Sequence, residues 1–424
     1  MGVASKNKSS LAVMQRDVLA HVLTFLDVVG MGIFDLAVAN KSDRDEWWLP
    51  ALSWTDSMSL SCYMNNCTNC CCVIPRRSSW LGVLEWVQLR QVRILALTLP
   101  ESSNVEEVCS KLSLLACPER IESMSFAGCS GVSLAALANL EHCPRLCVVS
   151  LAQTDVDDAS LNALLASHRS LTDLDLSDCV QLTTVSLAQQ GSLRNLCLHG
   201  CTWVGAAHLA SLAATSRQTL IHLNLCRCQG VTDAGLAALK GHTRLASLCL
   251  SGLDLITDAG AAHLQGLTSL EVLELGFCEL LSPAGIGAWL SRLPLLEILM
   301  LRGCSVGDEE LAVVAGLEHL RELDLCDCHE ITDVAMALLA NLQWLEEINL
   351  SHCGAVSGEG ILALGIAAPR LGQITVCNCD NLSDELVDTL DGYGVEVVTD
   401  GYGPEDEEEE EEDEDEEEEE EEEE

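Results

Sequence analysis

Cysteine is the residue type that could give this sequence chemistry, because the chain contains 23 of them. A dense group of them lies between residues 57 and 79, at Cys62, Cys67, Cys70, Cys71 and Cys72. The Cys67-x-x-Cys70 spacing is typical of half a zinc site, and Cys62 and Cys72 would complete a set of four thiolates. The group lacks the second ligand pair at the usual separation. We therefore predict an oxidation-sensitive thiol loop and no metal, with a zinc site as the alternative.

Other catalytic patterns are missing from the sequence. It contains no G-x-x-x-x-G-K-[ST] phosphate loop, no H-E-x-x-H metal motif and no G-x-S-x-G nucleophile turn. The segment formed by the first 90 residues is too short and too apolar for a catalytic site. The polar residues beyond it recur at intervals that spread them over a surface. We expect no enzymatic activity and no cofactor.

Nine other cysteines belong to a repeated frame, L-x-x-L-x-L-x-x-C, which recurs eleven times at intervals of 22 to 27 residues. Its units begin at Ile121, Leu146, Leu171, Leu193, Leu220, Leu245, Leu270, Leu296, Leu320, Leu345 and Leu371. This period is that of a leucine-rich repeat, and it predicts an α/β solenoid with parallel strands inside and helices outside. A degenerate unit near residues 92–97 and a final strand near 395–398 are expected to cap its ends.

Position nine of the frame is a cysteine in nine units and Thr154 or Leu253 in the other two. The nine are Cys129, Cys179, Cys201, Cys228, Cys278, Cys304, Cys328, Cys353 and Cys379. A solenoid spaces them one per coil, so they cannot converge on a metal ion. We interpret them as a structural ladder of buried thiols, each acting as a small apolar group with a weak donor.

A helix signal follows the cysteine, as in Val231-Thr232-Asp233 and Ile331-Thr332-Asp333. Thr or Ser is a favoured N-cap, and Asp in the first turn complements the helix dipole. Pro283 directly after Ser282 has the position expected of the first helical residue. Short helices are therefore predicted over stretches such as 234–239.

The conjunction of this cysteine with Ile/Val-Thr-Asp resembles the cysteine-containing repeats of the F-box/LRR family, over about 290 residues. The resemblance implies a horseshoe whose inner, concave face binds a protein substrate.

Residues 11–55 differ from the repeats, because Val18, Leu19, Val22, Leu23 and Leu26 recur at helical spacing. One interpretation is a helical cap over the first repeat. The other follows from the resemblance, since this region and residues 34–40 are similar to an F-box. An F-box implies that these five apolar residues bind the Skp adaptor of an SCF-type ubiquitin ligase.

The side chains that alternate with the buried leucines should face the concave side. Most are small or polar, but two adjacent units carry exposed apolar residues beside charged ones, at Val272, Glu274, Phe277, Ile298, Met300 and Arg302. Apolar anchors with a charged rim are typical of a protein-binding hot spot. Ordinary scatter of surface apolar residues is the alternative.

Charge excludes one class of partner. The chain has 66 acidic against 22 basic residues, and residues 405–424 are all Asp or Glu. This acidity argues against nucleic acid and favours basic proteins. The tail is expected to stay unfolded and either solubilises the chain or attracts basic proteins such as histones.

The predicted domains are a helical segment (1–56), a Cys-rich loop with a connecting helix (57–91), the solenoid (92–400) and the acidic tail (401–424). With no apolar run long enough for export or for a membrane helix, free thiols indicate a cytoplasmic or nuclear protein and no membrane partner. Two functions follow: an F-box-like receptor for ubiquitin-dependent degradation, or an LRR scaffold or chaperone-like protein.

Overall fold

The computed structural model describes residues 58–59, 94–99, 103–112, 115, 118–378 and 383–399. Contacts divide the chain into two compact units. The first ends at Trp203 and takes in residues 214–220, and the second holds residues 204–213 and everything from Ile221 onward. Each unit is a stack of leucine-rich repeats, and each is described by itself.

In unit 1 each described repeat contributes a short strand, and most add a helix. The strands are β1 (Met58–Ser59), β2 (Ile94–Thr98), β3 (Ser123–Ser125), β4 (Val148–Ser150), β5 (Asp173–Asp175) and β6 (Asn195–Cys197). The helices are α5 (Val105–Ser110), η3 (Pro118–Arg120), α6 (Leu134–Ala138), η4 (Asn139–His142) and α7 (Asp158–Ser167). The repeat that begins at Leu171 is the shortest, and its described residues between β5 and β6 form turns in place of a helix.

Unit 2 follows the same plan, after the helix α8 (Ala206–Ser216) that the division crosses. Its strands are β7 (His222–Asn224), β8 (Ser247–Cys249), β9 (Val272–Glu274), β10 (Ile298–Met300), β11 (Glu322–Asp324), β12 (Glu347–Asn349), β13 (Gln373–Thr375) and β14 (Glu396–Val398). Its helices are α9 (Asp233–Ala238), α10 (Asp258–Ala261), η5 (Ala262–Gly266), α11 (Pro283–Leu290), α12 (Asp308–Val314), α13 (Asp333–Leu339), α14 (Gly358–Ala367) and α15 (Asp384–Gly392).

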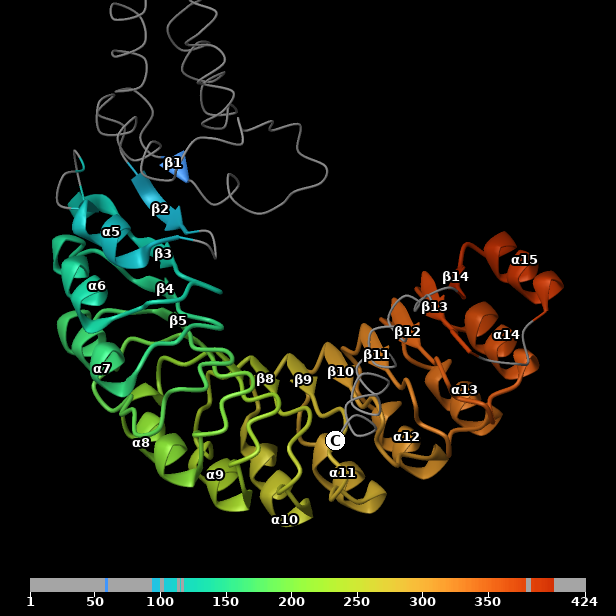
Figure 1. Cartoon of the computed structure of the whole chain (residues 1–424). Helices are drawn as coiled ribbons and strands as arrows, with labels where there is room; N and C mark the ends of the chain where they lie inside the picture. The colour runs from blue at the N-terminus through green and yellow to red at the C-terminus, as the bar shows by residue number, and fades with distance from the viewer. Residues whose placement is uncertain are drawn as a thin grey trace, which may run out of the picture. The chain divides into compact units, whose positions relative to one another are not determined.

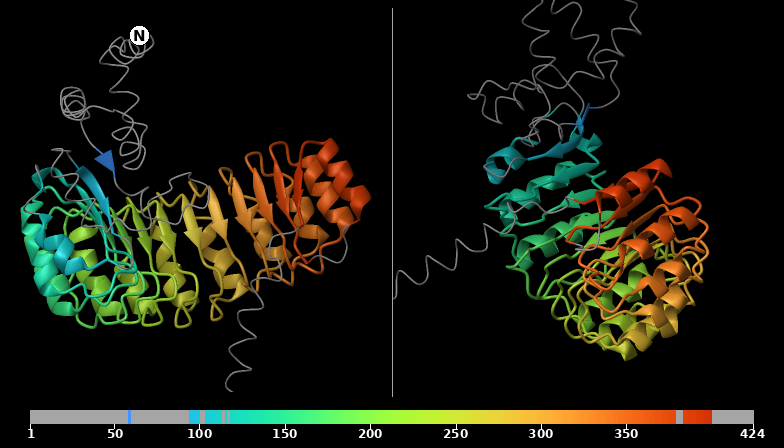
Figure 2. Two further views of the ribbon diagram at one scale, coloured as in Figure 1. Left: turned by 45° about the horizontal axis from the view of Figure 1, so that its top comes forward. Right: turned by 90° about the vertical axis from the view of Figure 1, so that its right-hand side faces the viewer.

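Within each unit every strand pairs in parallel with the strand of the next repeat, in sequence order. Figures 1 and 2 show the strands side by side on one face and the helices on the other. The predicted α/β leucine-rich-repeat solenoid is confirmed. Strands β2 and β14 lie where the degenerate first unit and the final strand were expected.

The leucines of the frame form the core between the strands and the helices. Every residue at position one, from Ile121 to Leu371, is buried, as are the residues at positions four and six. In each three-residue strand from β3 to β13 the middle side chain is buried, and the first and third are at least partly exposed with Cys249 as the exception. Strand side chains alternate between faces, so the outer two lie on the side away from the helices.

Position eight of the frame has a left-handed backbone conformation in all eleven repeats, and this conformation was not predicted from the sequence. Its φ lies between 52° and 70°, at Gly128, Gln153, Asp178, Gly200, Arg227, Gly252, Phe277, Gly303, Asp327, His352 and Asn378. This turn aims the N–H of position eight at the next repeat, as from Asp327 N to Ser351 O at 3.0 Å. Gly, Asp and Asn accept positive φ most easily, and their recurrence at this position was the available signal.

Position nine forms what we call the thiol ladder. Its described cysteines are buried, and most donate a hydrogen bond to the position-six carbonyl of the preceding repeat. The Sγ–O distances are 3.0 Å for Cys179 and Cys201, 3.1 Å for Cys353, 3.2 Å for Cys278 and Cys328, and 3.3 Å for Cys304. Thr154 donates to Leu151 O of its own repeat at 2.7 Å. Cys379 lies outside the described residues.

The Asp after the N-cap has a second role beyond the expected one at the helix dipole. Its carboxylate accepts two hydrogen bonds from the N-cap residue of the next repeat, which we call the carboxylate ladder. Asp258 Oδ1 accepts from Ser282 N at 2.9 Å and Asp258 Oδ2 from Ser282 Oγ at 2.6 Å. Asp233, Asp308 and Asp333 make the same pair of bonds.

We predict that Asp258→Ala destabilises unit 2 by about 1–3 kcal/mol, because it removes two charge-assisted hydrogen bonds and leaves Ser282 N–H partly buried without them. Urea unfolding measures the loss. Asp254→Ala is the matched control in the same repeat, since Asp254 is exposed and should leave the midpoint unchanged. Equal midpoints for the two variants would contradict a stabilising ladder.

Asp158 in unit 1 supplies a pH test of the same contact. Burial alone would raise its pKa, but hydrogen bonds from the side chains and backbone N–H groups of Thr183 and Thr184 outweigh it and lower the pKa to about 2. A carboxyl with a lowered folded pKa stabilises the fold above its unfolded pKa of about 4 and loses that effect as the pH falls toward 2.

We therefore expect Asp158→Asn to be less stable than the native chain at pH 6 in urea unfolding. The gap should narrow between pH 4 and pH 2, where the native carboxyl also becomes neutral. A gap that stays constant over this range would show that the carboxylate charge does not contribute.

Candidate functional site

The strand face of unit 2 carries the apolar residues singled out in the sequence. Register places Ile298 of β10 beside Val272 of β9 and Met300 beside Glu274. All four side chains are partly exposed. We call Val272, Ile298 and Met300 the apolar strip. Four of the six predicted contact residues are thus brought together on one face, and the other two lie elsewhere.

Met300 stands out because its position has a structural use in other repeats. There a short acidic or amide side chain accepts a hydrogen bond from the backbone N–H two residues later, as in Asp324 Oδ1 from Cys326 N at 2.8 Å and Asn349 Oδ1 from Ser351 N at 3.0 Å. This Asx turn stabilises the bend after the strand. A methionine cannot accept in this way, so the turn does not explain its choice.

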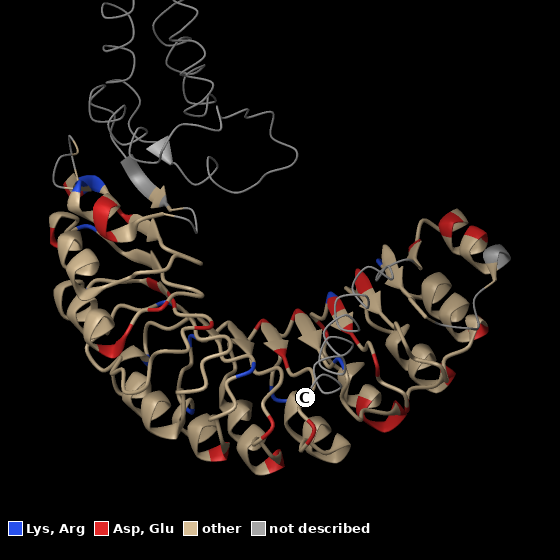
Figure 3. Cartoon of the chain, in the orientation of Figure 1, with Lys and Arg blue, Asp and Glu red and all other residues tan. Residues whose placement is uncertain are grey.

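Acidic residues border the apolar strip on the next strands. Glu322 pairs in register with Ile298, and Asp324 with Met300. Glu347 lies beside Glu322 in β12. We call Glu322, Asp324 and Glu347 the acidic triad, and Figure 3 shows acidic residues along these strands. Burial, and secondarily the charge of Glu347, raise the pKa of Glu322, so these carboxylates repel one another.

A shallow hollow lies over the same strands. It is lined by side chains of β10 to β13, among them Ile298, Met300 and all three members of the acidic triad. The hollow is open to solvent, and no residue outside these strands lines it. The geometry therefore offers a surface for a partner side chain.

Phe277 and Arg302 are the two predicted contact residues that the structure places off the strands. Each lies in the turn that follows its strand, at the sheet edge, so their part in binding stays a prediction. Phe277 adopts φ 56° and is 48% exposed. Its ring lies against Gly303, and the Arg302 guanidinium is 5.5 Å from the ring centroid. Exposed Leu280 follows three residues later.

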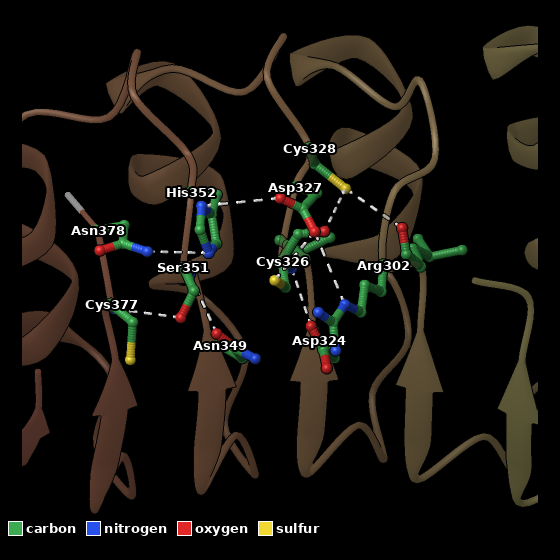
Figure 4. Close-up of polar contacts among 12 residues, drawn as sticks. Arg302, Asp324, Cys326, Asp327, Cys328, Asn349, Ser351, His352, Cys377 and Asn378 are labelled. Carbon is green, nitrogen blue, oxygen red and sulfur yellow. Dashed lines mark hydrogen bonds and ion pairs between the residues drawn. The ribbon is translucent and has the colours of Figure 1, made fainter. Parts of the chain in front are cut away.

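A polar row continues from Arg302 along the same edge (Figure 4). Arg302 Nε lies 3.7 Å from Asp327 Oδ2, and His352 Nδ1 lies 3.9 Å from Asp327 Oδ1. Asn378 Nδ2 is 3.4 Å from His352 Nε2. Asp327 thus holds the positive charge of Arg302 at this edge.

The thiol ladder is poorly suited to chemistry. Burial raises the pKa of Cys278 to about 11 and that of Cys304 to about 12, so both thiols stay protonated at neutral pH. No cysteine that the structure describes forms a disulfide bond. Within the described ranges no group of three or more His, Cys, Asp or Glu residues is arranged to hold a metal ion. The helices there are also too short or too polar to cross a membrane.

Two other sets of predicted residues lie outside the described residues. They are the five apolar positions of the F-box-like segment, Val18, Leu19, Val22, Leu23 and Leu26, and the loop cysteines Cys62 to Cys72. Their roles stay predictions, as do the domain boundaries that depend on them.

The Leucine Rich repeat family matches three stretches of the chain, residues 217–240, 316–340 and 341–365. The chain contains leucine-rich repeats. Modules of this kind bind other proteins, and this agrees with the open strand face. A search of the curated proteins gives no match.

Many solved structures have a similar repeat fold. An internalin, InlF, from Listeria monocytogenes is 18% identical, with a TM-score of 0.50 over 68% of this chain and 82% of that chain. The Rad7 and Elc1 complex from yeast matches at 18% identity over 74% and 90%, with a TM-score of 0.48. Internalin C2 of the same Listeria species matches at 24% identity over 50% and 81%, with a TM-score of 0.36. Of these three scores only the first reaches 0.5, and at 18% identity it shows the fold alone.

We predict that Phe277→Asp changes the free energy of unfolding by no more than about 0.5 kcal/mol, and so shifts the thermal midpoint little, because the side chain is exposed. The backbone should also accept aspartate there, because Asp178 and Asp327 occupy the equivalent left-handed position in other repeats. Leu275→Asp, two residues away but fully buried, is the comparison and should prevent folding. A large loss of stability in Phe277→Asp would give the ring a structural role in place of a binding one.

Proposed function

We propose that this protein is the substrate-binding subunit of an SCF-type ubiquitin ligase. In this proposal the strand face of unit 2 binds the protein to be degraded, and residues 11–55 bind the Skp adaptor. The two activities reside in separate parts of the chain, so each can be removed without the other.

The observation that supports target binding is the apolar strip on an open face. Val272, Ile298 and Met300 are partly exposed on adjacent strands, where the equivalent positions of other repeats carry mainly polar or small residues. Apolar side chains gathered beside charged ones are typical of the centre of a protein interface. Phe277 adds exposed aromatic surface at the adjoining edge.

The adaptor half of the proposal rests on the sequence. The spacing of Leu19 and Leu23 predicts one apolar helical face, in a segment that resembles an F-box and precedes repeats of the matching type. An F-box ahead of such repeats would join a target to the ligase through one continuous chain.

A second candidate is a scaffold or chaperone-like protein that attracts basic proteins through its acidic tail. Twenty consecutive acidic residues and an acidic body support it, since such a charge attracts histones and similar proteins over long range. In that case residues 11–55 are only a cap over the first repeat.

A crossed pull-down tests the proposal. Leu19→Asp with Leu23→Asp should abolish co-purification of the Skp adaptor and leave target capture intact. Met300→Asp or Phe277→Asp should abolish target capture and leave the adaptor bound. Capture is measured by mass spectrometry of proteins retained in cells with the proteasome inhibited.

Val180→Asp serves as the control, because Val180 is 65% exposed in unit 1 and belongs to neither proposed binding region; this variant should retain adaptor and target. Absence of Skp from the native pull-down would overturn the ligase assignment. If deletion of residues 401–424 abolished all capture, the scaffold candidate would replace it.

A further inference from the structure

We infer that the partner segment bound by unit 2 is basic, with an apolar side chain seated on the apolar strip and Lys or Arg side chains against the acidic triad. This inference rests on the proposed use of the strand face as the target-binding site. It specifies the chemistry of what binds there.

The order of side chains along the stack gives the face two ends. Strands β9 and β10 present the apolar strip, and strands β11 and β12 present the acidic triad. Neighbouring strands lie about 4.8 Å apart, so the two ends border each other directly and together span roughly 14 Å. About ten residues of helix cover that length. A single short segment can therefore contact both ends.

Within the described part of the chain the acidic triad forms no salt bridge, and the charge of Arg321 only partly offsets the rise in the pKa of Glu322. The nearby arginines are used elsewhere: Arg302 lies beside Asp327, and Arg321 lies between Glu297 at 3.7 Å and Glu346 at 2.9 Å. No described Lys or Arg forms a salt bridge with Glu322, Asp324 or Glu347. The raised pKa of Glu322 agrees with this crowding of like charges.

A Lys or Arg side chain of the bound segment can therefore pair with the acidic triad. It would remove the repulsion between Glu322 and Glu347 and gain charge-assisted hydrogen bonds in a partly desolvated hollow. The apolar strip supplies contact area that does not depend on charge. An acidic segment would meet repulsion at the triad, so the face selects against it.

Two other occupants fit less well. A second copy of this chain is itself strongly acidic, with a formal charge of −44. The acidic tail carries the same sign as the triad. Charge complementarity thus favours a basic segment of a different protein.

The test is a selection from a random peptide library displayed on phage, with the full chain as bait. We expect enriched peptides to combine Lys or Arg with Leu, Met or Phe. Their binding to the full chain, followed by fluorescence anisotropy, should weaken as NaCl rises, because exposed charges are screened.

Matched variants locate the binding. Glu322→Lys with Glu347→Lys should weaken the selected peptides at least about tenfold, and Met300→Asp at least about 30-fold, the effect of losing an interface hot spot. Glu141→Lys with Glu318→Lys makes the same charge change at exposed positions off this face and should alter binding less than about threefold. The tail is present in every variant, so its contribution is constant.

Three outcomes would overturn the inference. They are selected peptides without basic residues, equal affinity for the Glu322→Lys/Glu347→Lys variant, or concentration-dependent dimers that this variant abolishes, which would make a second copy the occupant. Each is separable from failure of the proposed function. If Skp does not bind but basic peptides are still selected, the ligase proposal fails and this inference stands. If Skp binds but the selected peptides are not basic, this inference fails and the ligase proposal stands.

Discussion

A repeat of this protein cannot bury its own leucines, and the rest of the structure depends on that constraint. Positions one, four and six give each repeat an apolar side that is covered only when the next repeat stacks against it. Stability therefore arises between neighbours, as in other linear repeat folds. The strands can be three residues long because parallel pairing continues from one repeat to the next.

Three further contacts act at the same junction and set the register of the stack. The left-handed turn at position eight aims its N–H at the following repeat, the thiol at position nine donates to the preceding one, and the Asp after the N-cap accepts from the following N-cap. These groups are small and polar, and the thiols among them are buried, so a displaced repeat would leave several of them without partners. The thiol's hydrogen bond to the preceding repeat gives cysteine at position nine a structural reason.

None of these contacts involves the side chains of the first and third strand residues. Those side chains are therefore largely unconstrained by the fold. Evolution can vary them at low cost to the fold, which makes this face suitable for recognition. Some are still constrained, since Asp324 and Asn349 close the turn that follows their strands. Ile298 and Met300 have no such task, and their apolar character next to Glu322 is what makes this stretch of the face a candidate site.

The sequence alone was enough for the repeat frame, the alternation of strands and helices, the start of α11 at Pro283 and the burial pattern, because each depends on local spacing and on the period of the side chains. Only the tertiary structure decided that Phe277 and Arg302 leave the strand face for the sheet edge, that Asp258 binds the next repeat, and that the acidic triad borders the apolar strip. These facts depend on which atoms of different repeats meet across the stack. Residues 25 positions apart become neighbours there, and spacing along the chain does not record the direction in which their side chains point.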